Sequence, residues 1–191
     1  MPTQMPIFET SRLLIRRLKQ SDLAPFHEMQ SDPEVMRYAS GEPEDKPGNT
    51  ASLNRCIEAY ATPGNRFRIW AVEEKSTGKW VGTCALVAAD EFKLPDDWVY
   101  ASETLPKQID EIGYRFLRSE WGKGWGGEVC HGLIDYCIEQ LGVSTLLAQV
   151  DTRNVASVRI LDRSKLKHLQ GFAAPTSGCD RVYLWQRGEN E

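Results

Sequence analysis

The stretch of sequence that decides the fold is Arg118-Ser-Glu-Trp-Gly-Lys-Gly-Trp-Gly-Gly-Glu128. It has four glycines within six residues and separates a predicted strand, residues 109–117, from a predicted helix, residues 127–141, that Gly142 ends. Glycine allows the backbone to approach a ligand closely, and the N–H groups at a helix N-terminus attract anions. The stretch therefore predicts a loop that binds a phosphate or pyrophosphate, with Arg118 and Lys123 adding positive charge.

Two well-known phosphate-binding loops share features with this stretch. A Walker loop needs Ser or Thr after Gly-Lys, and here Gly124 follows Lys123, so that loop is excluded. A dinucleotide fingerprint, G-x-G-x-x-G, is present from Gly122 to Gly127, with Asp151 after the next predicted strand. Only 40 residues follow Asp151, which is too few for the rest of a parallel sheet. An NAD(P)-dependent reductase therefore stays as an alternative rather than the first choice.

The composition is typical of one globular domain, which we expect to span residues 1–191. Hydrophobic residues make up 41% of the chain and charged residues 26%. The net charge of −4 argues against a nucleic-acid partner, whose phosphates usually require a basic face. No stretch approaches the ~20 apolar residues of a membrane span, and residues 1–6 lack a secretion signal. We therefore expect a cytoplasmic protein with no membrane partner.

The cysteines predict neither a disulfide framework nor a metal site. There are five of them, an odd number, and no two form a C-x-x-C pair. We expect buried free thiols in a reducing compartment. The sequence also shows no Cys-His or Ser-His-Asp arrangement that would indicate a covalent intermediate.

The rest of the chain alternates helix and strand patterns. A mobile loop is predicted for residues 40–49, and the long segment 88–107 is a candidate substrate-facing loop. Asn154 is a candidate N-cap of the helix expected at 155–164, and Lys165 follows that helix. We expect helices at 23–30, 33–38, 53–60, 127–141 and 155–164, and strands at 13–18, 66–73, 79–87, 109–117, 146–150, 169–172 and 181–186.

Several short motifs occur in an order that resembles the GNAT superfamily of N-acetyltransferases, and within it the RimJ/RimL branch. In that superfamily a loop of the form [QR]-x-x-G-x-[GA] holds the pyrophosphate of coenzyme A. Gly124 and Gly126 match its glycines, while Trp121 stands where Gln or Arg is usual. The other resembling motifs are Glu9-Thr-Ser-Arg-Leu-Leu-Ile-Arg16, Ser31-Asp-Pro-Glu-Val-Met36, Glu111-Ile-Gly-Tyr114 and Asn154-Val-Ala-Ser-Val-Arg-Ile-Leu161.

The resemblance implies an α/β (α+β) GNAT fold with a mixed, mostly antiparallel central sheet, splayed at the cofactor, and helices on both faces. It implies acetyl-CoA as co-substrate, no metal, and transfer of the acetyl group to a primary amine by direct attack in a ternary complex. The RimJ/RimL resemblance suggests a protein N-terminal amine as the acceptor, and a small-molecule amine, polyamine or antibiotic, is the alternative. A non-catalytic acyl-CoA sensor is a further alternative. Monomer and homodimer both remain open.

The resemblance also assigns residues to the cofactor. We expect backbone amides of the strand around 115–117 to contact the pantetheine arm and the oxyanion. Asn154 is expected to hydrogen-bond the pantetheine arm, in addition to capping its helix. The expected cofactor-binding residues are Phe116, Leu117, Arg118, Gly122, Lys123, Gly124, Trp125, Gly126, Gly127 and Asn154.

Direct attack by an amine requires a group that accepts its proton. Glu111 is our first choice for this base, because its strand could carry it to the acceptor side. Asp110 and Glu103 are the alternatives. His131 lies just inside the predicted cofactor helix and is expected to serve packing or the surface rather than catalysis.

The thiolate that leaves coenzyme A also needs a proton donor. Many relatives use a tyrosine on the helix after Asn154, and here Leu161 stands at that position. Ser157 is the substitute that the resemblance suggests. A second departure is Lys165-Leu166, where the superfamily usually has Gly-Phe. Because glycine permits a positive φ angle, Lys165 predicts mild strain or a different turn.

Overall fold

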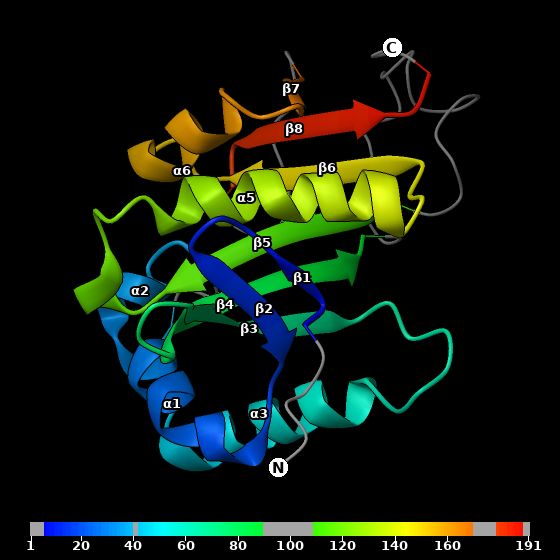
Figure 1. Cartoon of the computed structure of the whole chain (residues 1–191). Helices are drawn as coiled ribbons and strands as arrows, with labels where there is room; N and C mark the ends of the chain where they lie inside the picture. The colour runs from blue at the N-terminus through cyan, green and yellow to red at the C-terminus, as the bar shows by residue number, and fades with distance from the viewer. Residues whose placement is uncertain (1–5, 40–41, 90–108, 170–178, 189–191) are drawn as a thin grey trace.

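The computed structural model describes residues 6–39, 42–89, 109–169 and 179–188, which form one eight-stranded sheet (Figure 1). Its strands are β1 (Phe8–Glu9), β2 (Leu13–Arg17), β3 (Arg68–Glu74), β4 (Lys79–Ala88), β5 (Asp110–Phe116), β6 (Thr145–Val150), β7 (Lys167–His168) and β8 (Arg181–Gln186). The order across the sheet is β1-β2-β3-β4-β5-β6-β8-β7, and every neighbouring pair is antiparallel except β5 with β6. The predicted mixed, mostly antiparallel sheet is thereby confirmed.

Helices cover both faces of this sheet. They are α1 (Leu23–Ser31), α2 (Pro33–Met36), α3 (Lys46–Ala59), α5 (Trp125–Asp135) and α6 (Val155–Leu161). The helix α5 continues as a π-helical turn, Tyr136–Gln140, before Gly142 adopts a left-handed conformation. The helices α5 and α6 lie side by side on one face, and α1 to α3 cover the other (Figure 1).

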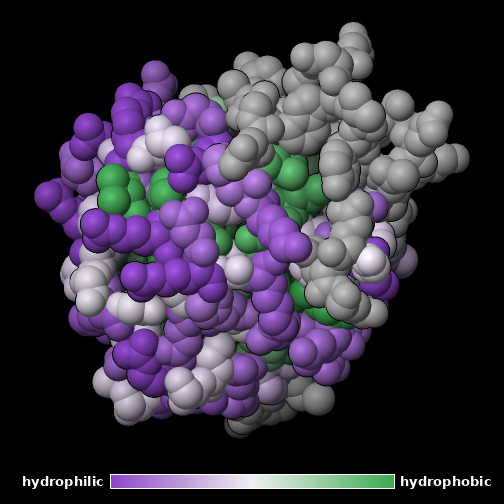
Figure 2. Space-filling model, turned by 90° about the horizontal axis from the view of Figure 1, so that it is seen from above, coloured by the Kyte–Doolittle hydropathy of each residue, from purple (hydrophilic) through white to green (hydrophobic). Residues whose placement is uncertain are grey.

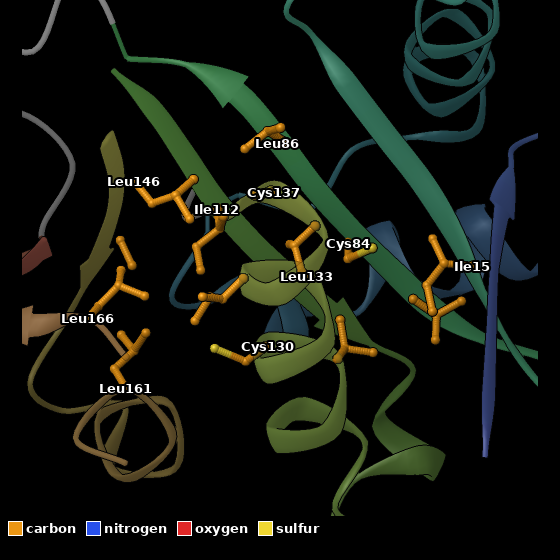
Figure 3. Close-up of a cluster of buried hydrophobic side chains, with 14 of the residues drawn as sticks. Ile15, Cys84, Leu86, Ile112, Cys130, Leu133, Cys137, Leu146, Leu161 and Leu166 are labelled. Atoms are coloured by element: carbon orange, nitrogen blue, oxygen red, sulfur yellow. The ribbon is translucent and has the colours of Figure 1, made fainter. Parts of the chain in front are cut away.

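The larger core lies between α5 and the sheet. The apolar side chains of α5 point at the strands, as Figure 3 shows for Cys130, Leu133 and Cys137. Burying each such side chain contributes roughly 1.5–3 kcal/mol, so this face anchors the helix that follows the glycine loop. The labelled residues that surround them are Ile15, Cys84, Leu86, Ile112, Leu146, Leu161 and Leu166.

A second core fills the opposite face. Its members come from α1, α2, α3 and the sheet: Leu18, Phe26, Met29, Val35, Leu53, Cys56, Ala71, Trp80 and Leu117. On β5 the two cores alternate, because successive side chains of a strand point to opposite faces. Ile112, Tyr114 and Phe116 therefore face α5, while Glu111, Gly113 and Arg115 face α1 to α3.

The strands β5 and β6 pair over only a short distance before they diverge. Their parallel register consists of Asp110 with Leu146 and Glu111 with Leu147. Beyond these residues β5 runs on to Phe116 and β6 to Val150 without further pairing between them. This divergence confirms the splayed strand that we expected, and it exposes one backbone edge of β5.

The prediction of a loop throughout residues 40–49 is wrong at its end, because α3 begins at Lys46. Asp45 is the N-cap, and its carboxylate accepts a hydrogen bond of 2.8 Å from the N–H of Gly48. Pro47 in the first turn lacks only an N–H that would have no helical partner. The Asp-Lys-Pro sequence therefore starts a helix.

Other boundaries also shifted. The helix α5 starts at Trp125 rather than 127, and α6 ends at Leu161 rather than 164. A short strand, β7, lies at Lys167–His168, and of the strand expected at 169–172 only Leu169 lies within the described part of the chain, because residues 170–178 lie outside it. The predicted substrate-facing loop falls almost entirely within residues 90–108, which also lie outside it.

Of the two outcomes predicted for Lys165, mild strain or a different turn, the structure shows the different turn. Among the described residues no amino acid other than glycine has a positive φ angle. Lys165 instead sends its ammonium group to the carboxylate of Asp135, 2.5 Å away, and Leu166 is buried in the core. The chain therefore turns there without the conformation that glycine would allow.

Seen from above, most of the coloured surface is hydrophilic, and apolar residues show as separate patches (Figure 2). Within the described ranges, no helix is long and apolar enough to cross a bilayer.

Candidate active site

The glycine loop presents an open helix N-terminus. Gly122 and Gly124 have φ angles of 79° and 83°, a region that side chains disfavour, and Gly124 is the N-cap of α5. Among the described residues, no side-chain cap hydrogen bond is made at the N-cap of α5, so its first N–H groups lack that acceptor. A Cβ placed on Gly122 or Gly127 would meet no described atom within 4 Å. The loop thus offers N–H groups, a helix dipole and space, which suits a phosphate group.

Glu120 holds the loop from inside. Its side chain is buried, and it accepts hydrogen bonds from Lys79 Nζ (2.6 Å), Lys123 Nζ (2.8 Å) and Trp125 Nε1 (3.2 Å). Burial alone would raise the pKa of Glu120, but the three donors lower it to about 2. The ammonium group of Lys123 is therefore shared with Glu120. Arg118 is exposed and has no side-chain partner within the described ranges.

A second anchor joins the loop to the start of β2. Glu128 accepts hydrogen bonds from Thr10 Oγ1 (2.5 Å), from the backbone N–H of Arg12 (2.8 Å) and from Arg12 Nε (2.7 Å). Arg12 also donates to the carbonyl of Lys123 (3.2 Å) and lies 4.3 Å above the ring of Trp125. No local pattern in the sequence indicates this network, because its two halves are separated by more than a hundred residues.

The exposed edge of β5 supplies backbone donors. Leu117 N–H donates to the carbonyl of Val81 (3.0 Å), and the carbonyl of Ile109 accepts from Ala89 (2.9 Å). Backbone groups alternate in direction along an antiparallel pair, so the N–H groups of Tyr114 and Phe116 point away from β4, toward the divergence. The backbone N–H predicted at Phe116 is thus available, whereas that of Leu117 is occupied.

Trp121 replaces the usual Gln or Arg in a structural role. Its indole N–H donates to the carbonyl of Phe116 (3.1 Å), and half of its side chain is exposed. Gly126 has a different reason to be glycine. A Cβ there would lie 2.9 Å from Cδ1 of Ile160 and 3.5 Å from the ring of Tyr114, so its absence lets α5, α6 and β5 pack closely.

Two hydroxyl groups lie on the α6 side of the divergence. The hydroxyl of Tyr114 is buried and accepts or donates no hydrogen bond within the described residues. Ser157 on α6 faces it outside normal hydrogen-bond geometry, and burial raises the pKa of the phenol. Asn154 caps α6 by accepting from Ser157 N–H (3.2 Å), as predicted. Tyr114 was missed, although the alternation of Ile112, Tyr114 and Phe116 indicated its face.

Glu111 lies on the other face, at the point where β5 and β6 separate. Its carboxylate accepts a hydrogen bond from Gln149 Nε2 (3.2 Å). Burial raises the pKa of Glu111, and the bond from Gln149 offsets part of that rise. Among the alternatives, Asp110 is paired with Arg66 at 2.9 Å, and Glu103 lies outside the described residues.

Two further residues considered in the sequence, His131 and Asp151, do not contribute to the site at the divergence of β5 and β6. His131 is exposed on α5, on the opposite face from Glu111. Asp151 binds the side chain and the backbone N–H of Arg153, so it shapes the turn before α6 and has little capacity left for a ribose. Among the described residues, no group of three or more His, Cys, Asp or Glu could hold a metal ion.

The buried cysteines are not activated thiols. Burial raises the pKa of Cys130 and Cys137 to about 12, and that of Cys56 to about 11. A thiol with such a pKa is almost entirely protonated at neutral pH and is a poor nucleophile. This agrees with the expectation that no covalent intermediate forms on the protein.

The sequence that forms the diverging strand pair and the glycine loop lies within a match to a known family. Residues 12–167 match the family described as the acetyltransferase (GNAT) domain. The chain belongs to the GNAT family. It is an acetyl-CoA-dependent N-acetyltransferase, and the reductase alternative fails because the sheet of this GNAT enzyme is not the parallel one that a dinucleotide fingerprint requires.

Relatives of this GNAT enzyme include YoaA of Bacillus subtilis strain 168, an uncharacterized N-acetyltransferase. It is 28% identical over 183 residues, which cover 96% of this chain and 90% of YoaA. An acetyltransferase from Agrobacterium tumefaciens strain C58 superimposes with a TM-score of 0.71 at 20% identity, covering 98% of both chains. Spermidine N-acetyltransferase from Vibrio cholerae, solved with CoA and spermine, gives a TM-score of 0.68 at 18% identity, covering 92% of this chain and 96% of that one.

Proposed function

We propose that this enzyme acetylates a primary amine by direct attack, with Glu111 as the base. The observation that carries the proposal is the position of Glu111, a partly buried carboxylate with a raised pKa beside the divergence of β5 and β6. The amine nitrogen bonds to the acetyl carbonyl carbon, the carbon–sulfur bond breaks, and the amine proton passes to Glu111. The carboxylate must be ionised to accept that proton.

The described residues fit acetyl-CoA, which supplies the activated acetyl thioester when bound. The open N-terminus of α5 and the exposed Arg118 suit the diphosphate. The N–H groups of Tyr114 and Phe116, which have no acceptor in the part of the chain that the structure describes, suit an extended arm with amide groups, much as an edge strand accepts another strand. One of these N–H groups would also face the oxyanion of the transition state. Asn154, the N-cap of α6, is the residue that we expect to hydrogen-bond this arm.

The leaving thiolate requires a proton, and two hydroxyl groups lie on the correct side to provide it. Ser157 is the donor that we expected, and the phenol of Tyr114 lies beside it. A side chain with a high pKa can still donate a hydrogen bond to a thiolate, which itself has a pKa near 8.5 in water. Ser157 and Tyr114 are therefore the two candidate donors of that proton.

For the acceptor, the RimJ/RimL-like motifs support a protein N-terminal amine. The tryptophan-rich glycine loop followed by Glu128 carries that resemblance. A small-molecule amine is the second candidate, because one structural neighbour is a spermidine N-acetyltransferase. A panel of peptides, polyamines and amino acids, assayed by release of free CoA thiol, distinguishes the two. An acyl-CoA sensor would bind acetyl-CoA and acetylate none of them.

Glu111→Gln tests the base. We expect kcat to fall about 100-fold or more, because general-base catalysis typically contributes that much, while acetyl-CoA binding stays unchanged. The wild-type rate should fall as the pH drops through the raised pKa of Glu111, because the protonated carboxyl group cannot accept a proton; the variant should lack this limb. Gln149→Ala, which removes only the neighbouring amide, serves as the matched comparison. A Glu111→Gln enzyme with wild-type kcat and pH profile would reject this assignment.

A further inference from the structure

Arg115 is a charged residue of β5 that has no partner of opposite charge among the described residues. It projects from β5 on the same face as Glu111, and its Nη1 donates to Gln30 Oε1 at the end of α1 (2.7 Å) and to the sulfur of Met36 in α2 (3.7 Å). In the part of the chain that the structure describes, neither Nε nor Nη2 of Arg115 has an acceptor, and no carboxylate lies within ion-pair distance. Three donors of a partly buried guanidinium are therefore available.

The acidic groups near Arg115 do not neutralise it. Glu44 attracts the guanidinium only at longer range, and its own carboxylate accepts a hydrogen bond from Ser52 Oγ (3.0 Å). Burial lowers the pKa of Arg115, although attraction to Glu44 offsets part of that effect. An arginine remains charged even so, and a partly buried charge without a counter-ion is unfavourable. A bound anion would remove that penalty.

On this face of β5, the position between Arg115 and the proposed base is open among the described atoms, and we call this position the hollow. Gly113 is the residue between them on this face of β5, and it has no side chain to fill the space. A Cβ placed on Gly113 would meet only the Cβ of Ala85, 4.0 Å away, among the described atoms. Residues 111 and 115 are about 13 Å apart along a strand, so a small molecule could contact both headgroups. The floor is the backbone of β5, next to the divergence.

We propose that the acceptor is a small primary amine that also carries a carboxylate, with Arg115 binding that carboxylate while Glu111 receives the amine proton. This rests on the acetyl transfer and the base of the proposed function, and it chooses an amino carboxylate as the acceptor in place of a protein N-terminus or a polyamine. The planar guanidinium offers two parallel N–H groups to a carboxylate, so binding would be bidentate and directional. A polyamine would bring a second positive charge toward Arg115, which is unfavourable. Arg115 thus acts as a specificity residue at the end of the hollow opposite the base.

The test is an acceptor series with matched charge. Amino carboxylates from glycine to 6-aminohexanoate are compared with their primary amides, which have the same length and no negative charge, together with spermidine and a peptide with a free N-terminus. We expect the best acid to exceed its amide about 100-fold in kcat/KM, as the loss of a charged, bidentate contact would predict. Equal rates for acid and amide, or spermidine or the peptide as the best acceptor, would overturn the proposal.

The variants separate recognition from folding. Arg115→Gln should raise KM for the acid about 100-fold and leave kinetics with the amide unchanged, and Arg115→Lys should retain part of the preference because it keeps the charge without the fork. Arg55→Gln, the same change at an exposed arginine of α3, is the control. Gly113→Val should raise KM for acid and amide alike by filling the hollow. If Arg115→Gln weakens both acceptors equally, Arg115 only supports the fold and the inference fails.

Binding measured without turnover distinguishes this inference from the proposed function. The unfolding midpoint is recorded with CoA and each amino carboxylate present. A midpoint that rises with the acid for the wild type but not for Arg115→Gln supports the carboxylate site even if no thiol is released, and the proposed function then fails by itself. Release of thiol without any preference for acids supports the function and rejects the inference. If no amino carboxylate binds and none is acetylated, the carboxylate site is rejected.

Discussion

At the scale of single residues, Glu120 explains why the glycine loop keeps one conformation. Four glycines in six residues would leave the unfolded loop with many accessible conformations. The buried carboxylate of Glu120 joins Lys79 of β4, Lys123 of the loop and the indole of Trp125 at the start of α5. Both lysines are about half exposed, so the energy of each ion pair is reduced by solvent.

Glu120→Gln should lower the free energy of unfolding by about 2 kcal/mol at pH 7. The substitution keeps the size of the side chain but removes the negative charge that pairs with two lysines. The pKa of Glu120 in the folded protein is about 2, below the usual 4.5. Its contribution is therefore complete above pH 4.5 and is lost as the pH falls toward 2.

Chemical denaturation at a series of pH values checks this prediction. The difference between wild type and Glu120→Gln should shrink across that window. Glu58→Gln, at an exposed carboxylate of α3 with no ion pair in the described part of the chain, should change stability little at any pH. A constant difference between wild type and Glu120→Gln down to pH 2 would contradict the account.

At the scale of elements, the start of β2 and the start of α5 depend on each other. Arg12 contacts Glu128, the carbonyl of Lys123 and the ring of Trp125, so one side chain fixes three points around the helix N-terminus. The N–H groups that form the expected phosphate site begin at Trp125. The position of β2 therefore affects the geometry of the cofactor loop.

Arg12→Ala should lower the free energy of unfolding by about 1–2 kcal/mol, since it removes a charged hydrogen-bond network and a cation–π contact. It should also weaken acetyl-CoA binding about tenfold, because the carbonyl of Lys123 loses its donor. Arg17→Ala is the control, at the far end of β2, where the guanidinium lies 5.3 Å above the ring of Tyr60. Calorimetric titration measures the affinity of each variant for acetyl-CoA. Equal affinities of Arg12→Ala and Arg17→Ala would exclude coupling between β2 and the glycine loop.

At the scale of the whole molecule, the proposed mechanism gives the two faces of the sheet different tasks. The face with α5 and α6 carries the glycine loop, Tyr114 and Ser157, and the face with α1 to α3 carries Glu111 and Arg115. The divergence of β5 and β6 is where the two faces meet. A co-substrate on one side can thus reach an acceptor on the other without a covalent intermediate on the protein.

Acetyl-CoA at a hundred times its dissociation constant should stabilise the protein by about 2.7 kcal/mol, which raises the unfolding midpoint by about 5–10 °C for a chain of this size. Gly124→Asp should abolish the rise, because it places a negative charge at the helix N-terminus. Gly78→Asp is the matched control: its φ angle of 69° imposes the same backbone strain in a hairpin turn, and there is open space around it. With acetyl-CoA, the unfolding midpoint should still rise for Gly78→Asp and should not rise for Gly124→Asp. Any other result would show that the loop is not the binding site.

The sequence by itself determined the elements and the family. Glycine spacing, the apolar periodicity of α5 and the caps at Asn154 and Gly142 are local signals, because each acts within a few residues of the chain. The placement of Glu111 on a strand next to the loop was also a local prediction. Its role as the base stays a prediction. The helix start at Asp45 was a local signal as well, and it was misread as a loop.

Only the tertiary structure decided which side chains meet. The contact of Arg12 with Glu128, the separation of β5 from β6, and the location of Arg115 between α1 and α2 join segments far apart in sequence. No local pattern encodes such contacts, because they depend on how the helices pack against two faces of one sheet. For the same reason Tyr114 was overlooked: its hydroxyl became notable only when folding buried it beside α6 without a partner among the described residues.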